Sequence, residues 1–321
     1  MSESTLTALN AARLDNLQLK GLNIEIPLKI LDTYANALMK ADSSMPANIL
    51  LVGPPWTGKT DLALVTAFKA KVSAFQLHSP KGGIVGETER KARLQQNVLK
   101  EWVPNISFID EVTEAMPLQR SDFDGDSGAS RAVTAALLTA LSDESRRGKS
   151  LLIATTNCPW RMGAAMRSRF TIVPVLHPLK ADFVHILLAT AKRVAPETDM
   201  DSANGQVIEA SNLFYEKGAN PRHIRLALSN ALHLHGALTP ETILFASSDF
   251  CGSADMAATI YSDLWAIKTT SSRSFLPWTT NPKDYPYPPY LNGVIDLATG
   301  DIVHSELDKR IKEYEPYGSN V

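Results

Sequence analysis

The stretch GPPWTGKT, residues 53–60, decides the fold of this chain. It follows an apolar run at 48–52, NILLV, and precedes DLALVTAFKAK, whose apolar residues recur with helical spacing. A buried strand, a glycine-bounded loop and a helix are the context that the pattern GxxxxGK[ST] requires of a phosphate-binding loop. Backbone N–H groups of such a loop, with the positive end of the helix, bind phosphate oxygens. The sequence therefore predicts a nucleotide site at the edge of a parallel α/β sheet.

Each position of this loop has an expected part in binding ATP and Mg²⁺. We expect Lys59 to reach the β- and γ-phosphates and the Thr60 hydroxyl to coordinate the metal. The expected nucleotide-binding set is Gly53, Pro54, Pro55, Trp56, Thr57, Gly58, Lys59, Thr60, Asp61 and Asp110.

The indole of Trp56 occupies one of the four variable positions of the pattern, so it does not break the motif. A residue other than glycine must there avoid a positive φ or bear backbone strain. We expect the indole to point outward, either over the nucleotide cleft or toward a neighbouring subunit, and nucleotide binding to survive.

Two further strand ends carry polar residues. The run ISFID at 106–110 leads into Asp110 and Glu111, and LLIAT at 151–155 leads into Thr156 and Asn157. A carboxylate at the end of a buried strand can hold Mg²⁺, and an adjacent one can deprotonate an attacking water. Asp110 is therefore the expected metal residue and Glu111 the expected base. Asn157 either positions the water or caps a turn before Pro159.

Length and composition limit the classes of protein to consider. A chain of 321 residues has room for two domains, and a formal net charge of −2 gives no electrostatic footprint for nucleic acid or an anionic membrane. The chain has no apolar run of the ~18 residues that a membrane span needs. With two cysteines and no signal-like N-terminus, we expect a cytoplasmic protein.

Taken together, these motifs resemble those of the AAA+ ATPases, and of the AAA branch in particular. GPPWTGKT is similar to the family's Walker A loop, ISFIDE to its Walker B and IATTN to the strand that ends in its sensor-1 asparagine. GAAMRSRF at 163–170 resembles the arginine-finger segment, which implies that Arg167 and Arg169 reach a neighbouring subunit's site. GANPRHIRLAL at 218–228 resembles the sensor-2 region and makes Arg222 the candidate phosphate-sensing arginine.

The resemblance implies an ATPase that assembles with copies of itself, as a ring and by expectation a hexamer, and that remodels or unfolds a protein partner. The segment SPKGGIVGETER resembles the family's pore loop 1, with Ile84 in the aromatic position before Val85 and Gly86. That loop either contacts a protein substrate or packs on its own domain. Two other functions are considered: a slow, nucleotide-gated scaffold that does not thread substrate, and a DNA-directed motor.

The chain divides into four expected parts. Residues 1–14 form a tail, 15–176 an α/β P-loop domain with a parallel sheet, 177–270 a small helical lid, and 271–321 a C-terminal extension. The extension begins with a Pro/Tyr-rich arm, LPWTTNPKDYPYPPY, and continues with a hairpin and a charged helix. The arm either covers its own chain or reaches a neighbouring subunit or partner.

Overall fold

The computed structural model describes residues 6–8, 21–77, 97, 100–115, 138–253 and 256–320. Within these residues one six-stranded sheet has the order β1-β3-β4-β5-β2-β6. The pairs that join β3, β4, β5, β2 and β6 are parallel, as the sequence predicts. Strand β1 pairs antiparallel with β3, so residues 6–8 belong to the sheet and not to the tail that the sequence division assigned to 1–14; an edge strand of three residues is too short to give a pattern of its own. The strands are β1 (Leu6–Ala8), β2 (Asn48–Val52), β3 (Ser73–Leu77), β4 (Asn105–Ile109), β5 (Ser150–Thr156) and β6 (Thr171–Pro174).

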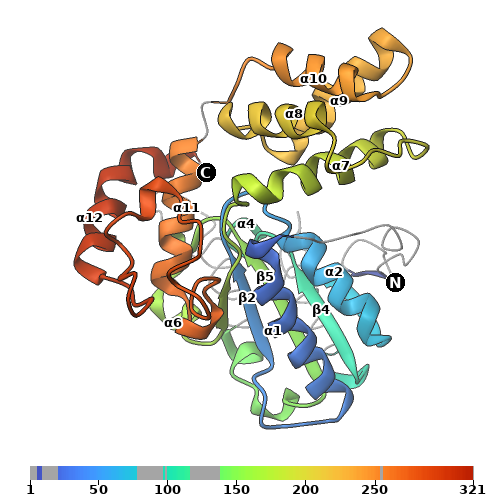
Figure 1. The fold of residues 1–321 in the computed structure, drawn as a ribbon. Coiled ribbons are helices and arrows are strands. Elements are labelled where there is room, and N and C mark those ends of the chain that lie inside the picture. Colours follow the sequence, from blue (N-terminus) through green and yellow to red (C-terminus); the bar gives the residue numbers. More distant parts are fainter. Residues whose placement is uncertain are drawn as a thin grey trace, which may run out of the picture.

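The described helices fall into three groups along the chain (Figure 1). The first group belongs to the sheet and comprises α1 (Leu22–Met39), α2 (Lys59–Ala70), α4 (Val112–Ala115) and α6 (Ala164–Arg167). The second comprises α7 (Phe183–Val194), α8 (Gly205–Glu216), α9 (Pro221–His235) and α10 (Pro240–Asp249). The third comprises α11 (Met256–Thr269) and α12 (His304–Tyr314), with short 3₁₀ turns between and after them.

The central strands are buried on both faces, which explains why they read as continuous apolar runs. Because successive side chains alternate between faces, Ile49 and Leu51 of β2 pack with α1 and α2, whereas Leu50 and Val52 belong to the cluster on the other face. The same alternation holds for β5. Each face of the sheet is therefore covered by its own hydrophobic cluster, and the loop that follows β2 begins at the carboxyl edge between them.

Helices α7 to α10 form a second domain with its own core, which Figure 1 shows above the carboxyl edge of the sheet. Phe183, Phe214 and Leu228 are fully or almost fully buried in that core. This unit is the helical lid that the sequence predicts. Asn220 and Pro221 begin α9, where the Asn220 side chain accepts hydrogen bonds from the N–H groups of Arg222 and His223.

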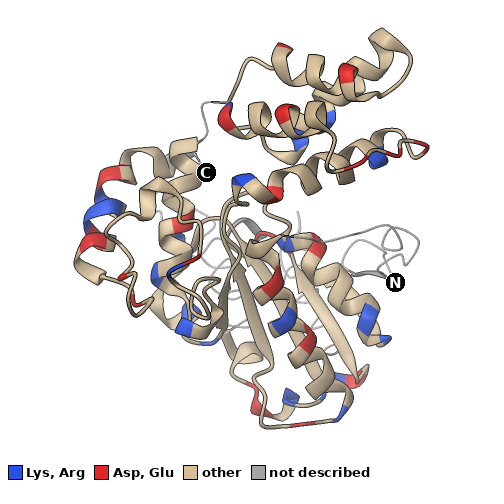
Figure 2. Cartoon of the chain, viewed as in Figure 1, with Lys and Arg blue, Asp and Glu red and all other residues tan. Residues whose placement is uncertain are grey.

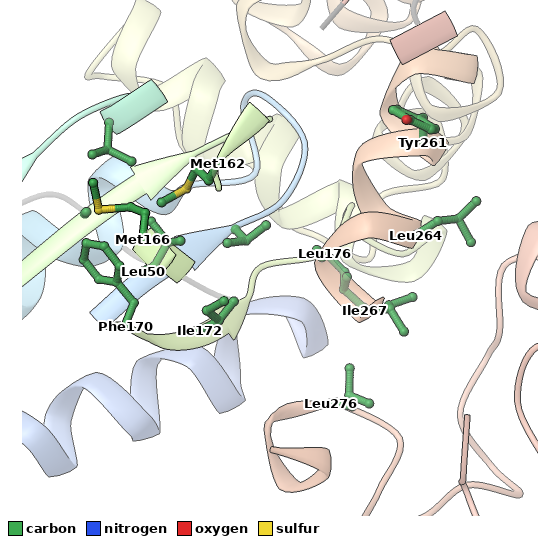
Figure 3. Close-up of a cluster of buried hydrophobic side chains, with 14 of the residues drawn as sticks. Leu50, Met162, Met166, Phe170, Ile172, Leu176, Tyr261, Leu264, Ile267 and Leu276 are labelled. Atoms are coloured by element: carbon green, nitrogen blue, oxygen red, sulfur yellow. The ribbon is translucent and has the colours of Figure 1, made fainter. Parts of the chain in front are cut away.

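Helix α11 does not belong to the lid, to which the sequence division at residue 270 assigned it. Its residues Leu264 and Ile267 share a hydrophobic cluster with Leu50 and Ile172 of the sheet (Figure 3). The lid core ends with α10. An amphipathic pattern shows that a helix has an apolar face, but not which domain covers that face.

The Pro/Tyr-rich arm covers its own chain. Trp278 is completely buried, and its ring lies 5.6 Å and 5.8 Å, between centroids, from Tyr285 and Tyr287. After the arm, a single antiparallel bridge between Ile295 and Ile302 precedes α12. The sequence left open whether the arm covers its own chain or reaches a neighbouring subunit or partner. The packing of Trp278 favours an arm that covers its own chain.

Basic and acidic side chains are interspersed over both domains (Figure 2). Among the described residues, no helix is both long enough and apolar enough to span a bilayer.

Candidate nucleotide site

The phosphate loop connects β2 to α2, and its two glycines have separate structural causes. A Cβ atom on Gly53 would lie 2.0 Å from the carbonyl oxygen of Val175, because the loop starts directly against the end of β6. Gly58 caps the start of α2 with φ 91°, a left-handed conformation that only glycine adopts without strain. These two positions set the path of the loop before any ligand binds.

The ammonium group of Lys59 lies inside the loop. Its Nζ donates to the carbonyl oxygens of Gly53 and Pro54, at 2.8 Å and 2.5 Å, and to Asn157 Oδ1 at 2.6 Å. Burial lowers the pKa of Lys59 to about 8, although the nearby carboxylates of Glu111 and Asp110 oppose the shift. The loop lysine and the asparagine at the end of β5 therefore meet, although 98 positions separate them.

Asp110 lies at the carboxyl end of β4, beside the start of α2. Its Oδ1 accepts hydrogen bonds from the Thr60 hydroxyl at 3.1 Å and from the Thr155 hydroxyl at 2.7 Å. A carboxylate and a hydroxyl at this spacing are oxygen ligands of the kind that Mg²⁺ prefers. No cluster of three His, Cys, Asp or Glu side chains suited to a metal occurs in the described part of the chain. A Mg²⁺ ion held also by phosphate oxygens requires no such cluster.

Glu111 follows with an unusual backbone. Its φ is 46°, in the left-handed region that is costly for a residue with a side chain. Its N–H donates to Thr155 Oγ1 at 3.0 Å, and its Oε2 accepts from the N–H of Asn157 at 3.3 Å. Strain of this kind is retained at sites where the surrounding contacts determine the backbone. The carboxylate of Glu111 is thus directed toward the tip of β5.

The indole of Trp56 points outward from the loop, half exposed at 50%, and toward the lid. Its backbone has φ 65°, so the residue bears the strain that the sequence allowed as one of two outcomes. The Arg222 guanidinium lies over the ring, with Cζ 5.7 Å from the centroid. Nearby, Arg193 of α7 pairs with Asp61 of α2 at 3.5 Å. The lid thus contacts the phosphate loop and its helix through two arginines.

Arg167 and Arg169 form hydrogen bonds with residues other than these groups. Arg167 donates to the carbonyl oxygens of Pro159 and Met162. The Nε of Arg169 donates to Ser142 Oγ at 2.7 Å, beside an open groove at the amino edge of the sheet. The phosphate loop leaves the carboxyl edge, so the four-residue strand β6, ~10 Å long, lies between the Arg169 backbone and that edge.

The sequence-predicted residues of the nucleotide site therefore divide into three groups. Lys59, Thr60, Asp110, Glu111 and Asn157 lie together, with Trp56, Asp61 and Arg222 at the rim. Arg167 and Arg169, the arginines expected to reach a neighbouring subunit, form their hydrogen bonds with other parts of the domain. The candidate pore loop, Ile84, Val85 and Gly86, lies outside the described residues.

Sequence reasoning missed two supports of this site. Thr155 bonds both Asp110 and the backbone of Glu111; its position at the end of the strand that leads to Asn157 was the available signal. Ser262 of α11 donates to the carbonyl oxygen of Asn157 at 2.8 Å, and the adjacent Asp263 is completely buried. No local pattern indicates this second support, because α11 reaches the site only through tertiary packing.

Comparisons with known proteins agree with this geometry. Residues 49–176 match the family model described as ATPase family associated with various cellular activities (AAA). The chain is 36% identical over 126 residues to ATPase family gene 2 protein of Saccharomyces cerevisiae. The matched segment covers 39% of this chain and 16% of that protein. It is 32% identical over 146 residues to the Cell division cycle protein 48 homolog of Archaeoglobus fulgidus, covering 45% of this chain and 19% of the relative. The chain thus spans less than a fifth of the length of these relatives.

Solved structures show the same fold over a larger share of the chain. The crystal structure of the FIGL-1 AAA domain has a TM-score of 0.65 at 20% identity, and the match covers 84% of this chain and 93% of that one. The same domain in complex with ADP has a TM-score of 0.64 at 20% identity, over 84% and 95% of the two chains. The likeness confirms the expected fold, a parallel sheet with a helical lid.

Proposed function

Because residues 49–176 form an AAA ATPase domain, we propose that this chain is a Mg²⁺-dependent ATPase whose sites are completed by neighbouring copies of itself. The observation that carries the proposal is the position of the charged and polar side chains at the two edges of the sheet. Lysine, hydroxyl, two carboxylates and an amide converge at the carboxyl edge of the sheet, while the finger arginine Arg169 lies at the amino edge.

The phosphate loop would bind the triphosphate through its backbone N–H groups and Lys59. In exchange for the carbonyl oxygens of Gly53 and Pro54, the ammonium group would gain phosphate oxygens, which are stronger acceptors because they are charged. Thr60 and Asp110 fit Mg²⁺, whose charge would stabilise the negative charge that develops on the transferred phosphoryl group.

Glu111 is proposed as the base that deprotonates the attacking water. Its carboxylate accepts from the backbone of Asn157, and the Asn157 side chain contacts Lys59. A water between these groups would lie near the γ-phosphate and would be oriented by the amide. Replacing Glu111 by Gln preserves the shape of the side chain and removes its basicity, so ATP should still bind while turnover stops.

Arg169 is proposed to act in trans. A guanidinium in the neighbouring site would stabilise the charge of the transition state, an effect of ~10³–10⁵ in rate in ATPases and GTPases of this type. Since Arg169 cannot reach the site of its own chain past β6, only an assembly of copies brings it there. A closed ring, for which we propose six subunits, provides every site with one such neighbour.

The test uses two inactive variants, Glu111→Gln and Arg169→Ala, alone and mixed. Each alone should retain ADP binding and hydrolyse ATP at less than about a tenth of the wild-type rate. In a mixed assembly, an intact site on the Arg169→Ala chain meets an intact arginine on the Glu111→Gln chain at about a quarter of the interfaces. Recovery of activity on mixing supports the shared site. If mixing restores nothing although the chains co-assemble, Arg169 has no role in trans.

We further propose that ATP hydrolysis drives the remodelling of a protein partner. The support is the likeness to relatives of the Cdc48 type, together with the interspersed basic and acidic residues along the described chain (Figure 2). Threading through a pore by Ile84, Val85 and Gly86 belongs to this proposal.

A further inference from the structure

Trp56 of the phosphate loop and Arg222 of the lid form the contact that the nucleotide chemistry does not explain. The guanidinium carbon lies 5.7 Å from the centroid of the indole, within the range of a cation–π interaction. One partner lies between Pro55 and Thr57 in the loop, and the other is the second residue of α9. The contact therefore joins the two domains at the loop that binds phosphate.

The backbone conformation and the exposure of Trp56 are both unfavourable for a tryptophan. At φ 65° a glycine would be unstrained, whereas tryptophan bears backbone strain. Half of the side chain remains exposed to solvent, so its burial stabilises the fold by only part of what a fully buried tryptophan would contribute. A strained, half-exposed aromatic residue in a binding loop points to a functional contact rather than to core packing.

Arg222 also occupies an electrostatically unfavourable position. It lies in the first turn of α9, a helix of 15 residues, where the positive end of the helix dipole disfavours a cation. In the part of the chain that the structure describes, no carboxylate forms an ion pair with Arg222, and its guanidinium lies over the indole face of Trp56. A guanidinium held in this way near the phosphate loop is suited to bind an anion.

We propose that Trp56 is a positioning residue for Arg222, whose guanidinium it holds over the phosphate loop before nucleotide binds. A guanidinium can stack on a ring with its face while it donates hydrogen bonds from its edge. Arg222 can therefore bind phosphate oxygens without leaving Trp56, and less side-chain freedom is lost on binding. The inference rests on the proposed function, and it makes the loop tryptophan part of the coupling between lid and nucleotide.

The test is a double-mutant cycle on ADP affinity, measured by titration calorimetry with Trp56→Gly, Arg222→Ala and the double variant. Loss of the contact should weaken ADP binding about two- to five-fold in Trp56→Gly. In the double variant, affinity should equal that of Arg222→Ala alone, because no guanidinium remains to be positioned. Trp56→Phe should retain most of the wild-type affinity, since it retains an aromatic face.

Thermal unfolding separates positioning from a structural role. Glycine relieves the strain at φ 65°, which offsets the buried surface and chain entropy that the substitution loses, so the melting temperature of Trp56→Gly should change little while its ADP affinity falls. Matched controls are Arg225→Ala, an exposed arginine on the same helix, and Trp102→Ala, an exposed tryptophan with 58% exposure. Neither control should change ADP affinity.

Additive effects in the cycle, or unchanged affinity in Trp56→Gly, would overturn this inference and leave the proposed ATPase intact. If the wild-type chain does not bind ADP at all, the proposed function and this inference fail together.

Discussion

Replacing Asp263 by Asn should make the protein more stable above neutral pH. Asp263 lies on α11, is completely buried and has two hydrogen-bond donors: the Tyr290 hydroxyl of the arm, and the N–H of His177 at 3.0 Å. Burial raises the pKa of Asp263 to about 7, and these hydrogen bonds and the charge of Lys59 lower it only in part. Asparagine can retain both contacts, with its oxygen accepting from His177 and its amide donating to Tyr290.

The sign and size of the effect follow from the two pKa values. In the unfolded chain the carboxyl has its ordinary pKa of 3.8, so between about pH 4 and 7 the folded state holds a proton that the unfolded state has released. The contribution to stability is thus fully present below pH 3.8 and is lost as the pH rises through about 7. At 1.36 kcal/mol per pKa unit, the loss is on the order of 4 kcal/mol.

Neighbouring titratable groups also make the stability depend on pH, so the effect of Asp263 is measured as the difference in stability between the variant and the wild type. Burial lowers the pKa of His177 to about 4, so this residue makes stability rise with pH between about 4 and 6.5, opposite to Asp263. The side chains that interact electrostatically with Asp263 are Lys59, Tyr215, Tyr285 and Tyr290. Subtracting the wild-type curve from the Asn variant cancels contributions that both chains share.

The assay is urea unfolding of both chains at pH 5, 6, 7 and 8, followed by circular dichroism. The stability difference should grow by about 1.4 kcal/mol per pH unit up to pH 7, in favour of the variant. Asp308→Asn, which removes an exposed carboxylate paired with Lys268, serves as the control and should show no such trend. Parallel curves for wild type and Asp263→Asn over this range would refute the argument.

Two further substitutions test the loop and the arm. Gly53→Ala should reduce ADP affinity at least tenfold, measured by calorimetry, because its Cβ would lie 2.0 Å from the Val175 carbonyl oxygen and displace the loop. Retained affinity would show that the loop tolerates displacement there. Trp278→Ala should destabilise the chain by roughly 3–5 kcal/mol in urea unfolding, because the side chain is fully buried against its own domain. A loss below about 1 kcal/mol would mean that the arm does not cover its own chain in solution.

The local order of strand, loop and helix is determined by the sequence alone. NILLV, the glycines and the helical run specify β2, the loop and α2, because each depends on neighbouring residues, on apolar periodicity and on backbone freedom. The placement of Asp110 and Asn157 also follows, since the carboxyl ends of parallel strands meet at one edge of a sheet.

Only the tertiary structure decided which surfaces meet. Helix α11 packs on the sheet and not in the lid, and Asp263 is consequently buried beneath the site. The pairing of Trp56 with Arg222, like the separation of Arg169 from its own phosphate loop, depends on how two domains and the two edges of one sheet lie in space. Such contacts join residues far apart in the chain, and an apolar or charged pattern within one segment specifies what a surface can bind but not which surface it meets.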